Sequence, residues 1–219
     1  MSARDANAYP SLLPSQWAGG EWTVIPSRDA DSRTAPHNRT IAIPRGVTYH
    51  QMLIRAHEMR HVIRNVDIST FGPEPRATWR KMTEEIALDV DALADGLDLA
   101  EARDGLDWSG WLSMFGTLDR VTMARECMQL ATSYQRSRND DIRTVRNACW
   151  SGLDARDRNV IDHAIRSIMA DTSHRNCDIW ADTLSAHFAP PPMPTQPTSA
   201  NEAEQAEESE AEGAERERE

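Results

Sequence analysis

The sequence lacks several features that would define a class of protein at once. It contains no CxxC pair, and its three cysteines, Cys127, Cys149 and Cys177, are widely spaced, which is typical of reduced thiols rather than of a disulfide framework. No apolar run approaches the length of about 18 residues that a membrane helix needs, and the first ten residues lack the apolar segment of a secretory signal. We therefore expect a soluble, cytoplasmic protein without a membrane partner.

Basic stretches are also missing, and lysine is almost absent. Lys81 is the only lysine among 24 lysines and arginines, a bias that indicates a G+C-rich coding genome and, with the short chain, a bacterial or phage origin. Nucleic-acid-binding proteins neutralise phosphates with clustered basic side chains. The sequence therefore does not favour a nucleic-acid partner.

The negative charge is concentrated at one end of the chain. The formal charge is −11, and residues 201–219 contain nine Glu and two Arg, a net charge of −7, which leaves −4 for the first 200 residues. From Ala189 onward the sequence is first Pro-rich and then rich in Glu and Ala, without apolar periodicity. We predict that residues 189–219 form a disordered acidic tail.

The remaining pattern predicts an α+β fold that is mainly helical, with one short sheet. Two β-branched runs at residues 21–25 and 39–43, each followed by proline, predict strands. Apolar residues with helical periodicity predict helices at residues 49–64, 76–95, 108–136, 140–150, 155–170 and 177–187. Residues 1–20 are polar and rich in turn formers, and we expect them to form a loose N-terminal arm.

The most informative motif lies at residues 57–61, which read His-Glu-Met-Arg-His, an HExxH sequence within the first predicted helix. Two histidines four residues apart lie on one helix face, about 6 Å apart along the axis. Both imidazoles can therefore bind one zinc ion at about 2 Å. Glu58 can accept a proton from a zinc-activated water and pass it to a leaving amine. The alternative is a chance match on a solvated helix face.

The helical wheel separates the histidines from the face that should pack against the domain. The apolar stripe of this helix comprises Met52, Ala56, Met59 and Ile63. His57 and His61 fall on the opposite side of the wheel. Arg60 falls near His57, so we expect its side chain either to reach past the site or to pair with an acid.

A catalytic zinc normally needs a third protein ligand, and the second predicted helix offers candidates. On its wheel Glu85 and Asp89 lie along one flank of the buried stripe, whereas Glu84, Asp91 and Asp95 fall on the side that faces water. An unpaired buried carboxylate costs several kcal/mol. Zinc and a ligand histidine would satisfy both flanking acids; pairing with nearby arginines is the alternative.

HExxH on one helix, followed by E-x-x-x-D from Glu85 to Asp89 on a second, resembles the gluzincin class of zinc metallopeptidases. The resemblance covers residues 39–96, roughly a quarter of the chain. It implies a zincin-like core at residues 21–105, followed by a helical subdomain at residues 106–188. It also implies that strand 39–43 is the edge strand along which an extended substrate binds.

The resemblance also implies a role for each residue of the motifs. His57, His61 and Glu85 would bind Zn²⁺, and Glu58 would act first as general base and then as general acid. Asp89 would accept a hydrogen bond from the outer ring nitrogen of a ligand histidine, in the first instance His57.

We therefore predict a zinc-dependent peptidase that acts on a peptide or protein. Glu126 is an alternative third ligand, and the later residues Tyr134, Arg138 and His163 are weak candidates for the group that stabilises the tetrahedral intermediate. Two other functions stay open: a regulatory peptidase that cleaves a repressor-like protein, and a non-catalytic metal-binding or structural protein that retains the zincin fold.

Overall fold

A three-stranded mixed sheet is followed by six α-helices in the residues that the computed structural model describes, which confirms the predicted fold class. These residues are 22–28, 32–35, 38–44, 48–66, 68–100, 110, 113 and 117–190. The predicted N-terminal arm and all but the first two residues of the predicted tail lie outside them. The division into a core at 21–105 and a helical subdomain at 106–188 stays a prediction.

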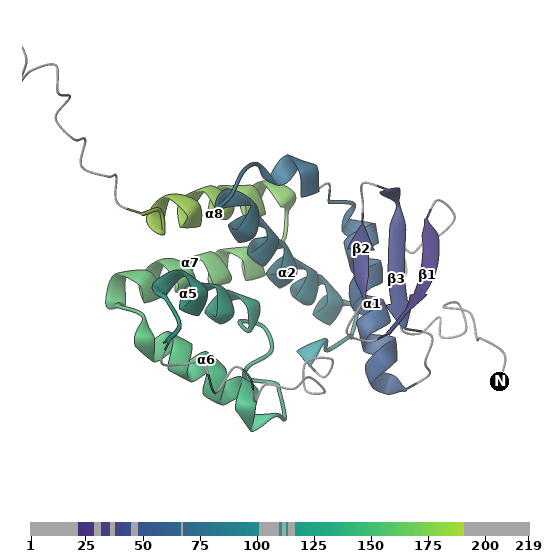
Figure 1. The fold of residues 1–219 in the computed structure, drawn as a ribbon, viewed down its shortest axis with the longest axis horizontal. Helices are drawn as coiled ribbons and strands as arrows, with labels where there is room; N and C mark the ends of the chain where they lie inside the picture. The colour runs from purple at the N-terminus through teal and green to yellow at the C-terminus, as the bar shows by residue number, and fades with distance from the viewer. Residues whose placement is uncertain are drawn as a thin grey trace, which may run out of the picture. The chain divides into compact units, whose positions relative to one another are not determined.

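The sheet has the order β1-β3-β2 (Figure 1). Strand β3 (Thr40–Pro44) pairs in parallel with β1 (Thr23–Ser27) and antiparallel with β2 (Arg33–Ala35). The prediction that residues 39–43 form an edge strand is therefore wrong, because β3 lies in the centre of the sheet. Its four successive buried residues, 41–44, agree with this central position. The two edges are β1 and β2.

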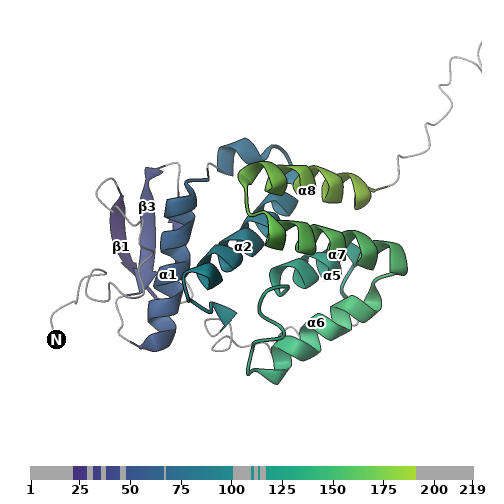
Figure 2. The same cartoon turned by 180° about the vertical axis from the view of Figure 1, so that it is seen from behind.

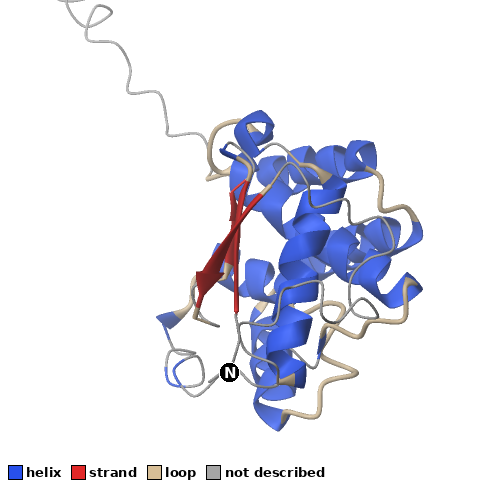
Figure 3. Ribbon diagram, turned by 90° about the vertical axis from the view of Figure 1, so that its right-hand side faces the viewer, coloured by secondary structure: helices blue, strands red, loops and turns tan. Residues whose placement is uncertain are grey.

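Helix α1 (Tyr49–Arg64) has the predicted bounds and covers one face of the sheet, as the strands and helices in Figures 2 and 3 show. It begins with a capping box in which the Thr48 side chain accepts from the Gln51 amide and the Gln51 side chain accepts from the Thr48 amide. It ends at Asn65, whose φ of +48° is left-handed. Met59 and Val62 pack on the buried isoleucines of β3. The opposite face of the helix is thereby left to the two histidines.

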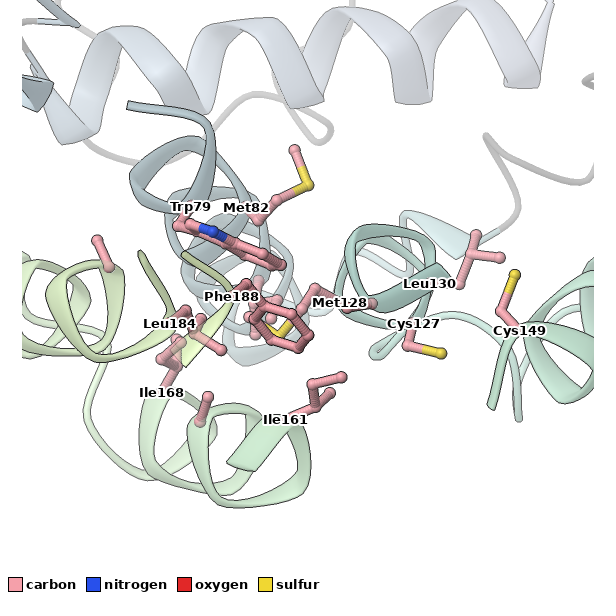
Figure 4. Close-up of a cluster of buried hydrophobic side chains, with 14 of the residues drawn as sticks. Trp79, Met82, Cys127, Met128, Leu130, Cys149, Ile161, Ile168, Leu184 and Phe188 are labelled. Atoms are coloured by element: carbon pink, nitrogen blue, oxygen red, sulfur yellow. The ribbon is translucent and has the colours of Figure 1, made fainter. Parts of the chain in front are cut away.

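Helix α2 (Arg76–Ala94) connects the sheet region to the remaining helices (Figure 1). It stops just before Gly96, whose φ of +79° favours glycine. At its N-terminal end, Trp79 is 1% exposed and stacks on Phe188 with a centroid distance of 4.9 Å (Figure 4). Burial of a large aromatic side chain stabilises a fold by about 3 kcal/mol. This contact therefore anchors α2 to the end of the last helix.

The remaining helices form the larger hydrophobic core together with α2 (Figure 4). Their bounds are α5 (Arg120–Gln129), α6 (Asp140–Gly152), α7 (Ala155–Ala170) and α8 (His174–His187). Of the long helix predicted at 108–136, the described residues show α5 followed by turns to residue 136. The three cysteines are buried, and burial raises their thiol pKa values to about 11 or 12.

A buried charge network joins α1, α2 and α8. Glu84 on α2 accepts hydrogen bonds from Arg64, in the last turn of α1, and from Arg80 at 2.7 Å. Arg80 also donates to Asp178 on α8 at 2.9 Å. Burial alone would raise the pKa of Glu84, but the two arginines outweigh it and lower that pKa below its usual value.

The wheel prediction that Glu84 faces water is therefore wrong. Glu84 is only 3% exposed. Two arginines compensate for the desolvation of the carboxylate: Arg80, one turn earlier on α2, and Arg64, which lies on α1 and is therefore absent from the wheel.

We expect Glu84→Gln to lower the free energy of unfolding by about 3 kcal/mol. The buried guanidinium groups of Arg64 and Arg80 then lose the buried carboxylate that they share and keep only their partly exposed partners Asp91 and Asp178. Urea unfolding followed by circular dichroism measures the change. Asp162→Asn is the matched control: it removes an i,i+4 pair with Arg166 at 2.9 Å on the surface of α7, which is worth about 0–1 kcal/mol. Equal losses in the two variants would contradict the network's role.

Glu126 gives the stability a dependence on pH. This residue is 7% exposed on α5, and burial raises its carboxyl pKa to about 7. A raised pKa means that folding favours the protonated form, so this stabilisation is complete at low pH and is lost as the pH rises through 7. We expect stability to fall by about 2–3 kcal/mol between pH 5 and pH 8. The fall should disappear in Glu126→Gln; urea unfolding at the two pH values tests this.

Candidate metal centre

Three side chains from two helices meet at one point. His57 and His61 of α1 approach each other with their Nε2 atoms 3.3 Å apart. Glu85 of α2 places Oε2 at 3.4 Å from Nε2 of His57 and Oε1 at 3.5 Å from Nε2 of His61. One oxygen of Glu85 and the two ring nitrogens all lie within 4.8 Å of one another. The structure thus brings together the three residues that the sequence predicts as ligands.

These separations fit a tetrahedral metal ion. Two ligand atoms that each lie about 2.1 Å from zinc in a tetrahedral site are about 3.4 Å apart. The three shortest distances match that value. Each oxygen of Glu85 lies close to a different histidine. The carboxylate can therefore bind a metal ion with both oxygens or, after a small rotation, with one. His57, His61 and Glu85 all line the pocket, so a metal held by them would be accessible to water or substrate, as a catalytic site requires.

The charge state of His61 also suits a metal ligand. Burial lowers the pKa of its imidazole, against the opposing effect of the Glu85 carboxylate. A lowered pKa favours the neutral ring, which is the form that donates a lone pair to a metal. No proton then has to leave this histidine before a metal binds.

Glu58 lies between the metal centre and the sheet. The residue is buried, and the hydroxyl group of Thr34 on β2 lies 2.7 Å from its Oε2 and 3.0 Å from its backbone carbonyl oxygen. Thr34 therefore fixes one oxygen of the Glu58 carboxylate. Glu58 itself lines the same pocket as the two histidines.

This pocket has a volume of about 300 Å³, the lower end of the range for small-molecule sites. Residues Ser32, Arg33 and Thr34 at β2 form one wall, and α1 contributes the HExxH side chains. Lys81, Glu84 and Glu85 of α2 and the apolar side chains Val66 and Phe71 complete it. Metal ligands, the candidate base and two cations are thus collected in one cavity.

Asp89 lies one turn beyond Glu85 on α2 and is buried. It accepts a hydrogen bond from the hydroxyl group of Thr132, and it is not among the residues that line the pocket. The role assigned to Asp89, to accept a hydrogen bond from His57, stays a prediction.

Arg60 takes one of its two expected positions, because it pairs with an acid. Its guanidinium donates to Asp95, at the end of α2, at 2.7 Å. Arg60 does not line the pocket, so it leaves the metal centre unobstructed. Within the described residues it forms a second link between the two helices that carry the ligands.

The other candidates lie elsewhere. None of Glu126, Tyr134, Arg138 and His163 is among the described residues that line the pocket. Glu126 is also outside the one group of side chains in the described residues that could hold a metal. The alternative third ligand therefore has no support from the geometry.

Comparisons with protein-family models, with curated proteins and with solved structures found no match. The chemistry of the site therefore rests on its own geometry. Among the described residues, none of the helices has the length and apolarity that a membrane crossing needs.

Four further residues around the site carry no sequence pattern that predicts their position. Thr34 and Arg33 lie on β2, a strand of three residues that gives too short a β-branched pattern to be recognised. Arg64 and Lys81 belong to correctly predicted helices, but only the helix arrangement shows what they face. The i,i+4 spacing of Lys81 and Glu85 was the one signal that could have placed Lys81 near the site.

We expect the purified protein to bind about one equivalent of zinc. Both His57→Ala and the isosteric Glu85→Gln should lose most of this zinc. Zinc should also raise the unfolding temperature of the wild type, because a ligand that binds only the folded state stabilises it. Elemental analysis by mass spectrometry and a thermal-shift assay measure the two effects.

The control for this experiment is His163→Ala, which removes an exposed histidine of α7. It should retain zinc as the wild type does. Less than about half an equivalent in the wild type, or equal contents in wild type and His57→Ala, would refute the metal centre.

Proposed function

We propose that the protein is a zinc-dependent peptidase in which His57, His61 and Glu85 hold the metal. The observation that supports this most is the group of His57, His61 and Glu85, whose ligand atoms lie within 4.8 Å of one another next to a buried glutamate. When bound there, zinc supplies a Lewis acid that polarises the substrate carbonyl and activates water. The residues of the chain have separate roles around it.

Glu58 is the proposed proton carrier. Because Thr34 engages Oε2, the other carboxylate oxygen is the one that can face a water in the pocket. Glu58 takes a proton from the attacking water and delivers it to the leaving amine, as general base and then as general acid. The fixed carboxylate lowers the reorganisation that each proton transfer requires.

Strand β2 takes the place that the sequence analysis assigned to β3. In the described residues β2 pairs with β3 along one side only, and Ser32–Thr34 form a wall of the pocket. An extended peptide can add to such an edge through main-chain hydrogen bonds. We propose that the substrate lies along β2 with its scissile bond above the metal centre.

A second candidate is a metal-binding protein without peptidase activity. It is favoured by one observation: Tyr134, Arg138 and His163, the candidates for stabilising the tetrahedral intermediate, do not line the pocket. The binding of zinc alone does not separate the two candidates. A variant of the proton carrier does.

We expect Glu58→Gln to keep its zinc and to cleave peptides at least about 100-fold more slowly than the wild type, since general acid–base catalysis contributes about 10²–10⁴-fold. Mass spectrometry of a peptide library after incubation with each protein measures cleavage. Asp162→Asn, a surface acid of α7, is the control and should cleave at the wild-type rate. A zinc-loaded Glu58→Gln with full activity would refute the mechanism; a zinc-loaded wild type without activity supports the second candidate.

A further inference from the structure

Two cations from different elements line the pocket that contains the candidate metal centre. Lys81 lies on α2, one turn (about 6 Å) before Glu85. Arg33 lies on β2, directly before Thr34, whose hydroxyl group binds Glu58. Each cation is therefore within one residue or one helical turn of a group that is proposed to take part in the reaction.

Neither cation is neutralised within the described part of the chain. Arg33 and Lys81 are exposed, and no described residue forms an ion pair with either of them. The arginines nearest to the site behave differently, because Arg60, Arg64 and Arg80 all pair with acids. Glu84, the remaining acid of the pocket, is occupied by two of those arginines.

With a divalent metal ion bound, the charges of the pocket residues would not balance. Apart from Glu84, the pocket contains two carboxylates, Glu58 and Glu85, and two cations, Arg33 and Lys81. A bound divalent metal would leave a net charge of +2 in a protein whose formal charge is −11. A concave site with this local excess attracts an anion.

We propose that Arg33 and Lys81 form a carboxylate-binding subsite, so that the substrate carries a carboxylate next to the bond that is cleaved. An arginine fork suits the two oxygens of a carboxylate, and a lysine adds a point charge from the other wall. The carboxylate is either the free C-terminus of a peptide or an Asp or Glu side chain. This inference rests on the proposed peptidase function and specifies its substrate.

The test uses two small hydroxamates that bind zinc through the same head group. Succinic acid monohydroxamate carries a carboxylate at its other end, whereas butyrohydroxamate carries a methyl group in its place. Isothermal titration calorimetry on the zinc-loaded wild type measures both dissociation constants. We expect the carboxylate to strengthen binding about tenfold, an effect that should shrink at higher ionic strength.

The variants Lys81→Met and Arg33→Met keep a flexible, unbranched side chain and remove its charge. Each should reduce the preference for the charged hydroxamate about two- to fivefold, and the double variant should abolish it, while butyrohydroxamate binds as before. Arg156→Met, an exposed arginine of α7 that does not line the pocket, is the control and should retain the preference.

The outcomes separate this inference from the proposed function. If butyrohydroxamate binds but the carboxylate adds nothing, or if the double variant keeps the preference, the subsite is refuted and the metal centre stands. If neither compound binds, the metal centre fails and the subsite fails with it.

Peptide pairs distinguish the two sources of the carboxylate. They differ either in a free or amidated C-terminus or in Glu against Gln, and their affinity is measured on zinc-loaded Glu58→Gln. Weaker binding of the amide identifies the chain end, and weaker binding of the Gln peptide identifies the side chain. Equal binding within both pairs contradicts the proposal.

Discussion

The buried pairing of Glu84 with Arg64 and Arg80 is the constraint on which the metal centre depends. The two histidines and Glu85 come from different helices, and helices move as nearly rigid bodies, so the ligand triangle exists only if α1 and α2 are fixed against each other. Arg64 lies three residues after His61, and Glu84 lies directly before Glu85. The ion pair therefore joins the helices at the level of the ligands themselves.

A buried ion pair is a costly way to join two helices, because both groups lose their hydration. Apolar side chains of similar size stabilise at least as well, but they tolerate sliding. Guanidinium and carboxylate groups have fixed directions, and Glu84 uses both of its oxygens, one for each arginine. The network thus stabilises the fold no more than apolar packing would, but it fixes the position of α1 against α2. The hydrogen bond from Arg80 to Asp178 extends the network to α8.

The prediction from sequence succeeded where the information is local. The bounds of α1 follow from its own periodicity and its capping residues, and the spacing of HExxH places His57 and His61 on one face whatever surrounds the helix. The wheel singles out Glu85 because a carboxylate on a buried flank needs a cation, and the structure places Glu85 beside both histidines. These inferences require no knowledge of the neighbouring elements.

Prediction failed where the surroundings of a residue depend on which other helix or strand packs against it. A wheel contains one helix and so places Glu84 in water, whereas its partner Arg64 becomes relevant only when α1 packs against α2. The resemblance implies that β3 is an edge strand, and the sequence pattern does not correct this, because β2 is three residues long and carries only one β-branched residue, Thr34. The order of strands in a sheet is a long-range property that a single strand's composition does not contain.

Strand β2 contributes both to the proposed substrate site and to the position of the Glu58 carboxylate. The same short strand forms the edge of the sheet, contributes Arg33 to the pocket and holds the carboxylate of Glu58 through Thr34. It is attached to the rest of the described structure by its ladder to β3 and by contacts to α1, of which the Thr34–Glu58 hydrogen bond is one. A peptide that adds to the free edge of β2 would reduce the freedom of this strand, and with it the freedom of Thr34. In the proposed peptidase, binding of substrate and orientation of Glu58 would therefore be coupled through a single side chain, and a substrate that leaves β2 unengaged would meet a less ordered Glu58.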